Sequence, residues 1–312
     1  MVPPEPSFAD RDGTIWMDGE LVPWREASTH VLTHTLHYGV GVFEGVRAYS
    51  TPTGPSIFRL EDHTRRLFDS AKILRMEIPF DFEELCEAQK TTFRANGLQE
   101  GYLRPLAFLG SEAMGLRAQG LSVHVSIASW PWPDYMDPES REKGLRVQTS
   151  SYTRHHVNIS MCKAKAVGHY INSILALSEA IDGGYDEALL LDNEGYVAEG
   201  TGENVFLVKN GVIHTPELTS CLDGITRNTI MVFAQELGIQ VIERRITRDE
   251  FYIADEAFFT GTAAEVLPIA QIDGRTIGTG SRGPITHKLQ AMYLDVVRGK
   301  SPNHEEWRTP VG

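Results

Sequence analysis

Short apolar runs flank three two-residue sequences that are typical of tight turns. They are Asp18-Gly19 between IWM and ELV, Asn210-Gly211 between VFLVK and VIH, and Asp273-Gly274. Asp, Asn and Gly tolerate the positive φ angles that type I′ turns require, so each of these sequences predicts a β-hairpin. Antiparallel strand pairing should therefore dominate.

Five other segments place apolar residues at helical spacing. They are 61–75, 82–95, 170–182, 226–237 and 285–298. The second follows a capping-box pattern at Asp81 and Glu84, and it stops at Asn96-Gly97. Strands and helices do not alternate as βαβ units, so the pattern predicts an α+β fold and not a doubly wound sheet.

The length of the chain predicts two domains. With 312 residues, each domain could bury a core of its own at roughly 150 residues per domain. The best candidate for the joint is SWPWPDYMDP at 129–138, where three prolines interrupt regular structure. We expect a smaller α+β domain over 1–129, an interdomain loop over 130–138 and a larger domain over 139–312. The polar residues from Lys300 to Gly312 predict a loosely held end.

The composition is that of an ordinary globular protein, with 41% hydrophobic and 23% charged residues. A formal net charge of −13, without a basic cluster, argues against a nucleic-acid partner. The first residues lack the apolar core of a leader, and no run approaches the roughly 18 apolar residues of a membrane span. These features predict a cytoplasmic protein with no membrane partner.

The sequence does not indicate a metal site. The three cysteines are odd in number, far apart and without a C-x-x-C pair, so neither a disulfide framework nor a zinc site is expected. His30, His34 and His37 lie close together but have no acidic or cysteine partner nearby. We therefore expect no bound metal.

A lysine that could act as a nucleophile lies in MCKAKAVGHYINS. The segment offers Lys163 and Lys165, which would share a face if it were a strand. A lysine among Ala, Val and Gly is desolvated more easily than most, which makes its amine a better nucleophile at neutral pH. The spacing does not choose between the two, and both could be surface lysines on an edge strand.

An acidic residue leaves a strand-like run for a glycine-rich turn in YVAEGTGENVF. Glu199 could pair there with a protonated ring nitrogen, and Glu203 lies in the same loop. Either carboxylate could instead be a solvated loop charge. Residues 200–202 are not a dinucleotide fingerprint, because they lead into a strand where that motif requires a helix.

Two further segments suit an anion. In CLDGITRNTI, Gly224 permits close backbone approach, while Ile225 and Thr226 present N–H groups where a helix begins and its dipole favours negative charge. Residues 261–263, Gly-Thr-Ala, could bind phosphate or a carboxylate at a strand end. Taken alone, the first of these segments is read more readily as a simple turn. Together, a lysine amine, an acid and a phosphate cup are what a pyridoxal phosphate site needs.

Several longer motifs follow one another along most of the chain. They are HYGVGVFEGVRAY at 37–49, FRLEDHTRRLFDSAK at 58–72, YLRPLAF at 102–108, AKAVGHYINS at 164–173, EGTGENVF at 199–206, DGITR at 223–227 and GTAAEVLP at 261–268. In this order they resemble the branched-chain-amino-acid aminotransferases, fold type IV pyridoxal phosphate enzymes, from about Trp16 to Gly299. The resemblance implies a two-domain α+β fold like that of the D-amino-acid aminotransferases, in which the larger, β-barrel-like domain carries the Schiff-base lysine.

The resemblance also assigns cofactor roles. It selects Lys165, five positions before a tyrosine, as the lysine that holds pyridoxal phosphate as a Schiff base. Tyr170 is expected to hydrogen-bond the ring oxygen, and Glu199 to pair with the pyridine nitrogen. The expected phosphate ligands are Arg66, Gly224, Ile225, Thr226 and Thr262.

The substrate residues implied by the resemblance are Tyr38, Phe43, Gly45, Arg47, Tyr102, Arg104, Leu116, Trp132, Tyr135, Thr262 and Ala263. Aromatic walls would suit a branched aliphatic side chain, and Arg104 could meet the distal carboxylate of glutamate. Family members are homodimers or larger with the active site at the subunit interface, so Tyr38 and Leu116 are expected to come from a partner subunit. Val167 and His169 stand where Gly and Asn are frequent in the family.

We therefore expect an enzyme of branched-chain amino-acid biosynthesis, acting on small amino acids and 2-oxo acids. It would move the amino group of L-leucine, L-isoleucine or L-valine reversibly to 2-oxoglutarate. A D-amino-acid aminotransferase, an (R)-amine transaminase and an aminodeoxychorismate lyase remain open within the group. A binding protein without activity is a further alternative, against which the retention of Lys165, Tyr170 and Glu199 argues.

Overall fold

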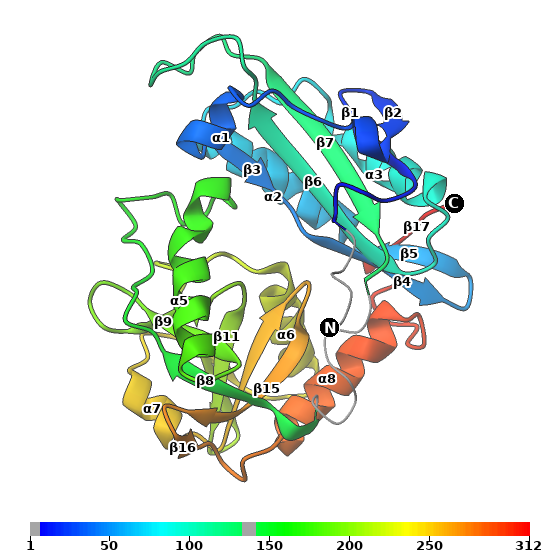
Figure 1. Ribbon diagram of the computed structural model, residues 1–312. Helices are drawn as coiled ribbons and strands as arrows, with labels where there is room; N and C mark the ends of the chain where they lie inside the picture. The colour runs from blue at the N-terminus through cyan, green and yellow to red at the C-terminus, as the bar shows by residue number, and fades with distance from the viewer. Residues whose placement is uncertain (1–6, 133–141) are drawn as a thin grey trace, which may run out of the picture. The chain divides into compact units, whose positions relative to one another are not determined.

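The computed structural model describes residues 7–132 and 142–312, which form two compact units (Figure 1). Unit 1 contains the chain up to residue 133 together with Ala164–Gly168 and His304–Gly312, and unit 2 contains Asp134–Lys163 and His169–Asn303. This grouping differs from the sequence-based division, which assigned 164–168 and the C-terminal residues to the second domain. The interdomain loop expected at 130–138 lies largely outside the described residues, so that boundary stays a prediction.

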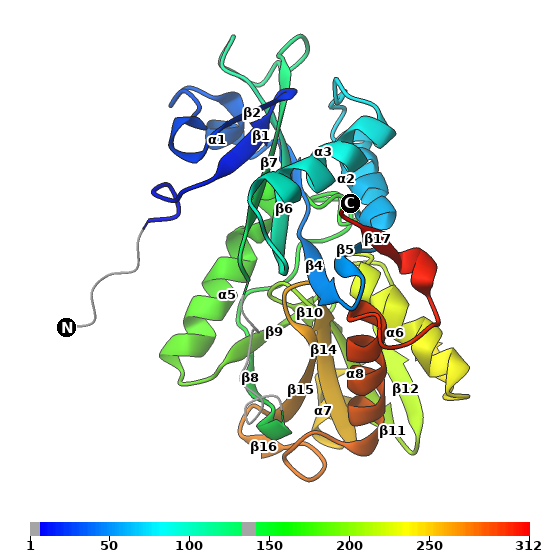
Figure 2. The ribbon, with the colours of Figure 1, turned by 90° about the vertical axis from the view of Figure 1, so that its right-hand side faces the viewer.

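The strands of unit 1 form one antiparallel sheet, in the order β17-β5-β4-β6-β7-β1-β2, with β3 paired to β6. Their bounds are β1 Thr14–Met17, β2 Glu20–Pro23, β3 Gly41–Phe43, β4 Val46–Thr51, β5 Gly54–Phe58, β6 Gly101–Leu109, β7 Val123–Trp130 and β17 Arg308–Pro310. The helices are α1 His34–Tyr38, α2 Leu60–Ile73 and α3 Phe82–Ala95. Figure 2 shows α2 and α3 side by side, and their apolar residues share a buried cluster with those of the sheet.

The C-terminal residues are part of this sheet, so the predicted loose end is wrong. β17 pairs antiparallel with β5, and the N–H of Val311 donates to the carbonyl of Pro55 at 3.0 Å. The Val311 side chain is 1% exposed, and Arg94 donates to its carbonyl. The tail reads as polar in sequence, but a strand far away in the chain provides its partner.

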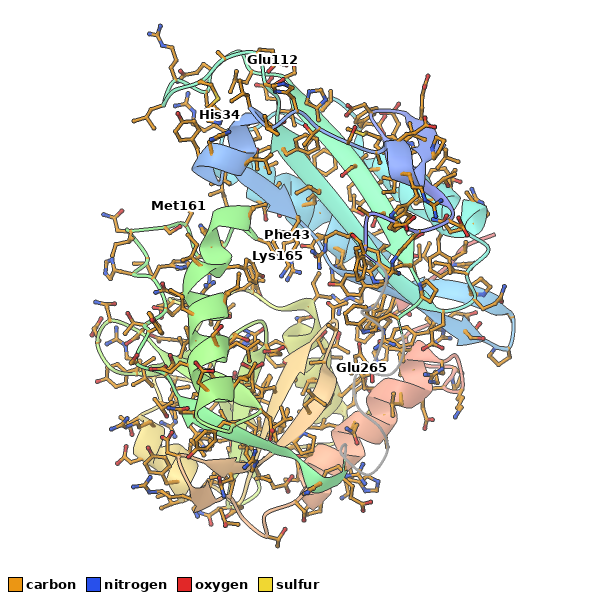
Figure 3. The ribbon with its side chains drawn as sticks, in the orientation of Figure 1. His34, Phe43, Glu112, Met161, Lys165 and Glu265 are labelled. Carbon is orange, nitrogen blue, oxygen red and sulfur yellow. The ribbon has the colours of Figure 1, made fainter. Side chains whose placement is uncertain are left out.

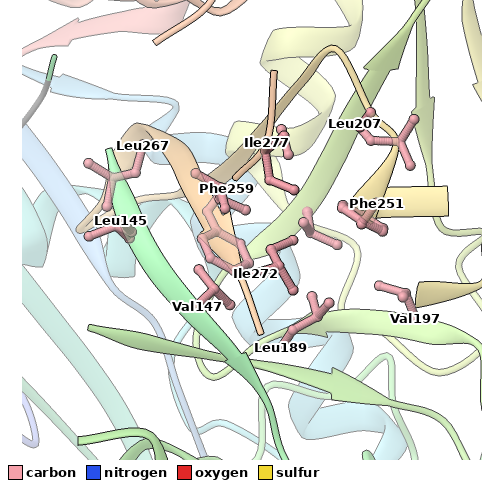
Figure 4. Close-up of a cluster of buried hydrophobic side chains, with 14 of the residues drawn as sticks. Leu145, Val147, Leu189, Val197, Leu207, Phe251, Phe259, Leu267, Ile272 and Ile277 are labelled. Atoms are coloured by element: carbon pink, nitrogen blue, oxygen red, sulfur yellow. The ribbon is translucent and has the colours of Figure 1, made fainter. Parts of the chain in front are cut away.

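Unit 2 holds a second sheet, in the order β10-β9-β8-β15-β14-β11-β12-β13, with β16 paired to β15. Its strands are β8 Leu145–Thr149, β9 Glu187–Leu191, β10 Val197–Gly200, β11 Asn204–Lys209, β12 Val212–Thr215, β13 Val241–Glu243, β14 Glu256–Gly261, β15 Glu265–Ile272 and β16 Arg275–Thr276. The helices are α5 Ile171–Asp182, α6 Ile225–Glu236, α7 Arg248–Tyr252 and α8 Pro284–Val297. The core gathers side chains such as Val147, Leu189, Phe251 and Phe259 from four separate elements (Figure 4). Its barrel-like character stays a prediction.

All three predicted hairpins are confirmed. They join β1 to β2, β11 to β12 and β15 to β16, each with antiparallel register. The first residue of each turn has a φ near 50°, at Asp18, Asn210 and Asp273, and the glycine that follows is also at positive φ. Only residues that tolerate this conformation allow a two-residue turn that follows the twist of the strands.

The five predicted helices are confirmed within one or two residues as α2, α3, α5, α6 and α8. The capping box at α3 is present, with Asp81 accepting from the Glu84 N–H at 2.7 Å and Glu84 accepting from the Asp81 N–H at 2.8 Å. The short helices α1 and α7 were not predicted, because five residues give too little periodicity. Within 7–132 and 142–312, no helix combines the length and apolar character needed to cross a membrane.

Candidate active site

Lys165 lies in a short segment that unit 1 holds by its backbone. Its N–H donates to Ser70 Oγ of α2 at 3.0 Å, and its carbonyl accepts from the Phe43 N–H at 3.1 Å. The next residue, Ala166, forms a single β-bridge with Val42. Figure 3 shows Lys165 beside Phe43, and its ammonium nitrogen is 5.0 Å from the centre of the Phe43 ring. The half-buried amine is therefore carried by a backbone fixed from both sides.

The two candidate lysines have different surroundings. The segment is not a regular strand, so the shared face that a strand would give does not arise. Lys163 is exposed and belongs to unit 2, where its ammonium donates to the carbonyl of Leu218. Lys165 is the less exposed of the two and belongs to unit 1. Burial thus distinguishes two residues that their spacing could not.

Arg66 is not part of a wet helix face, which was the alternative reading of its position. Its side chain is 13% exposed and points at Glu44, which follows β3. The guanidinium donates from Nε to one carboxylate oxygen at 2.6 Å and from Nη2 to the other at 2.9 Å. His63, one turn earlier on α2, contacts the same carboxylate at 2.7 Å through Nδ1.

Aromatic rings surround one cation on the same sheet. The Arg104 guanidinium lies 4.8 Å from the Phe43 ring centre and 5.4 Å from that of Tyr102, while its Nε is buried without a hydrogen-bond partner. Tyr102 and Trp132 have ring centres 4.9 Å apart. A Cβ at Gly45 would come within 1.8 Å of the Tyr102 hydroxyl, so only glycine fits. Five expected substrate residues are thus gathered in unit 1.

The other expected substrate residues of unit 1 differ in their surroundings. Arg47 is buried, lies 4.7 Å from the Tyr49 ring centre and is 3.4 Å from a Glu100 oxygen. Tyr38 is exposed, and its hydroxyl accepts from the Gly115 N–H. The neighbouring Leu116 is 91% exposed. Tyr135 lies outside the described residues.

In unit 2, Glu199 is a buried acid and not a solvated loop charge. It is the third residue of β10 and is 7% exposed. One carboxylate oxygen accepts from the Leu222 N–H at 3.1 Å, and the other lies 2.5 Å from Arg154 Nε. The Arg154 N–H is not aimed along this contact, so it is an ion pair and not a hydrogen bond. Glu203, the alternative acid, is only half-buried.

The predicted phosphate cup begins a helix. α6 starts at Ile225, directly after Gly224. A Cβ at Gly224 would lie 1.9 Å from Asn204 Oδ1, so a side chain there cannot be accommodated without moving Asn204. Ile225 and Thr226 are buried, whereas the turn that contains Thr262 and Ala263, between β14 and β15, is half-buried. Tyr170 is the N-cap residue of α5.

The chain matches the family model described as amino-transferase class IV over residues 41–272. It belongs to the class IV aminotransferases. A relative from Pseudomonas aeruginosa named branched-chain-amino-acid aminotransferase is 65% identical over 305 residues, which are 98% of this chain and 99% of the relative. A solved branched-chain amino acid aminotransferase from the source abbreviated T.th. is 50% identical and covers 97% of this chain and 99% of its own. Its structures with pyridoxamine 5′-phosphate and with N-(5′-phosphopyridoxyl)-L-glutamate have TM-scores of 0.95 and 0.93.

Sequence reasoning missed several residues that this class IV aminotransferase places beside the expected site residues. Glu44 and His63 lie inside recognised motifs, where a buried acid next to an arginine was the available signal. Arg154, in SYTRHH, follows no pattern that could have identified it. The three cysteines are free thiols. Among the described residues, no group of three or more His, Cys, Asp and Glu side chains could hold a metal ion.

Proposed function

We propose that the protein is a pyridoxal-phosphate-dependent aminotransferase that transfers the amino group of L-leucine, L-isoleucine or L-valine to 2-oxoglutarate. The observation that carries this proposal is the 65% identity, over nearly the whole chain, to the branched-chain-amino-acid aminotransferase of Pseudomonas aeruginosa. The phosphopyridoxyl-glutamate bound by the T.th. enzyme supports a glutamate and 2-oxoglutarate couple.

The described residues fit this cofactor. Gly224 leaves bare backbone at the start of α6, where N–H groups and the helix dipole favour a phosphate. Glu199 is a buried carboxylate of the kind that can face a protonated pyridine nitrogen. We assign the cofactor ligands as Arg66, Lys165, Tyr170, Glu199, Gly224, Ile225, Thr226 and Thr262.

Bound pyridoxal phosphate supplies an electron sink for the bond electrons of the substrate Cα. Lys165 Nζ holds the cofactor covalently, is displaced by the substrate amine and then takes the proton from Cα. The Glu199 carboxylate keeps the ring nitrogen protonated, and the Tyr170 hydroxyl donates to the ring oxygen. The backbone contacts of Lys165 to Ser70 and Phe43 restrict where its amine can move the proton.

One pocket must accept both an aliphatic and an acidic side chain, because both half-reactions use it. The rings of Phe43, Tyr102 and Trp132 suit leucine, and the Arg104 guanidinium suits the distal carboxylate of glutamate. We assign the substrate residues as Tyr38, Phe43, Gly45, Arg47, Tyr102, Arg104, Leu116, Trp132, Tyr135, Thr262 and Ala263.

We also propose that the enzyme is a cytoplasmic homo-oligomer whose active sites lie at subunit interfaces. The support is the exposure of Tyr38 and Leu116, two apolar residues of the substrate set that a partner subunit would cover. Light scattering of the purified protein, compared with that of Leu116→Glu, measures the oligomeric state. A monomeric parent with full activity would contradict this part of the proposal.

An amino-donor panel with 2-oxoglutarate tests the function. The panel contains both enantiomers of leucine and valine and one simple (R)-amine, and glutamate formation is measured. The L-branched donors should react fastest, and the purified protein should absorb visible light. Preference for the D-enantiomers or the amine would replace the proposed substrate class. A colourless protein that shows no turnover when pyridoxal phosphate is added would remove the enzyme assignment.

A further inference from the structure

Three polar side chains of unit 1 are buried against one another where β3 ends and α2 passes. Glu44 is 1% exposed and accepts from Arg66 at 2.6 and 2.9 Å and from His63 at 2.7 Å. His63 and Arg66 are three positions apart on α2, so both lie on the same face of the helix. The backbone of Glu44 is also held, because its N–H donates to the Pro105 carbonyl at 2.8 Å.

The geometry of the Arg66–Glu44 pair defines the orientation of the guanidinium. A guanidinium is planar and presents its donors in a fixed fork. Glu44 takes the edge formed by Nε and Nη2, so a second oxyanion would meet the same plane at its other edge. A side chain with several rotatable bonds is thereby restricted to one direction before any ligand arrives.

This arrangement is expensive to bury if stability is its only role. Burial alone would raise the pKa of Glu44, but Arg66 and His63 outweigh that effect and hold the pKa far below its usual range. Burial lowers the pKa of His63 more than Glu44 raises it, so His63 is neutral at neutral pH. Buried ion pairs are often no more stabilising than apolar residues of similar volume. A role in fixing Arg66 accounts for the cluster better.

We propose that Glu44 is a positioning residue that fixes the Arg66 guanidinium to receive the cofactor phosphate, and that His63 holds the Glu44 carboxylate in place. The inference rests on the proposed function, in which Arg66 is a phosphate ligand. It also opposes a simple charge argument. Because Glu44 is negative, its removal should strengthen phosphate binding if only net charge mattered. Positioning predicts the opposite sign.

The test compares pyridoxal phosphate with pyridoxal on the apoenzyme. Both bind by the ring and the aldehyde, but only the first carries a phosphate, so the ratio of their affinities isolates the phosphate contacts. Glu44→Gln should lower this ratio about tenfold or more, and Arg66→Ala should lower it at least as much. In the double variant the ratio should equal that of Arg66→Ala alone, because Glu44 acts through Arg66.

His63 provides a matched pair of variants that leave the acid and the arginine in place. His63→Asn keeps an N–H donor near the position of Nδ1, so its affinity ratio should stay close to that of the parent. His63→Leu removes the donor, and the ratio should fall about threefold or more. If Glu44→Gln does not fold, this pair carries the test on its own. Glu250→Gln, which alters a similar bidentate pair with Arg244, is the control and should leave the ratio unchanged.

The outcomes separate the inference from the function on which it rests. An unchanged or higher ratio in Glu44→Gln, equal losses for pyridoxal and pyridoxal phosphate, or additive losses in the double variant would each overturn the positioning role. If Arg66→Ala itself keeps the parent ratio, the assignment of Arg66 as a phosphate ligand fails instead. Thermal unfolding of each apoenzyme variant shows whether a loss of binding reflects a loss of fold.

Discussion

Each unit of the protein contains a buried Glu–Arg pair beside the expected cofactor site, and the two pairs are used in opposite ways. In unit 1, Arg66 is the proposed ligand and Glu44 supports it. In unit 2, Glu199 is the proposed ligand and Arg154 accompanies it. One ion pair would therefore meet the phosphate with its cation, and the other would meet the ring nitrogen with its anion.

The way each pair is held follows from the member that must be fixed. Arg66 has a long, flexible side chain, and two hydrogen bonds to Glu44 restrict it. Glu199 is short and starts from a strand, so one backbone N–H, from Leu222, and the charge of Arg154 suffice. A flexible cation needs a bidentate partner, whereas a carboxylate on a strand needs little more than charge compensation.

Lys165→Ala should have the largest effect, because both pairs serve a cofactor that this lysine holds. We expect loss of turnover and of the visible absorption band. Lys163→Ala is the matched control, since the two lysines are two positions apart, and it should keep both properties. Steady-state rates and absorption spectra measure the effect. Normal transamination by the Lys165 variant would remove the assignment, and both pairs would lose their proposed context.

Glu199→Gln should come next, with turnover slowed about a hundredfold or more while cofactor is still bound. An amide cannot keep the pyridine nitrogen protonated as a carboxylate does, but it has nearly the same shape. Single-turnover kinetics and thermal unfolding separate the chemical effect from stability. If the rate is unaltered, the role passes to Glu203, and Glu203→Gln should then show the loss.

Arg154→Met sharpens the comparison, because it removes the supporting member of the second pair. We expect turnover to fall about tenfold, less than for Glu199→Gln, since the acid remains and loses only its compensating charge. The affinity ratio of pyridoxal phosphate to pyridoxal should stay at the parent value, unlike that of Arg66→Ala. A changed ratio would mean that Arg154 also reaches the phosphate, and the division of roles between the units would fail.

Arg104→Met should have the smallest effect, confined to one class of substrate. Within the described residues, no carboxylate pairs with Arg104, and aromatic rings flank it instead. KM for 2-oxoglutarate and glutamate should rise about tenfold, while leucine and its oxo acid change much less. Initial rates at varied concentrations of each substrate give the asymmetry. Equal losses for both classes would give the distal carboxylate to another residue, with Arg47 as the next candidate.

The fold was predictable where a few neighbouring residues decide the conformation. The Asp-Gly and Asn-Gly turns require positive φ, and the capping box at Asp81 and Glu84 is complete within four residues. The strand at residues 308–310 was missed because its stability comes from β5, which lies far away in sequence. Five-residue helices such as α1 carry too little periodicity to be recognised.

The candidate site shows the same limit. Lys165, Glu199 and Gly224 were found because motifs mark them, and the structure adds the burial of Glu199 and the crowding at Gly224. Glu44 and Arg154 were missed because their importance lies in a partner that only folding brings close. Ion pairs between distant segments leave no periodic trace in one sequence.

The pairing of β17 with β5 also has a consequence for synthesis. Phe58 and Arg308 are register partners separated by about 250 positions. At about 5 to 20 residues per second, a ribosome needs roughly 12 to 50 s to cover that distance. During this time one edge of β5 has unpaired backbone groups that invite other strands. The first unit to leave the ribosome is therefore the last to be finished, and the nascent chain depends on protection of that edge until its final residues emerge.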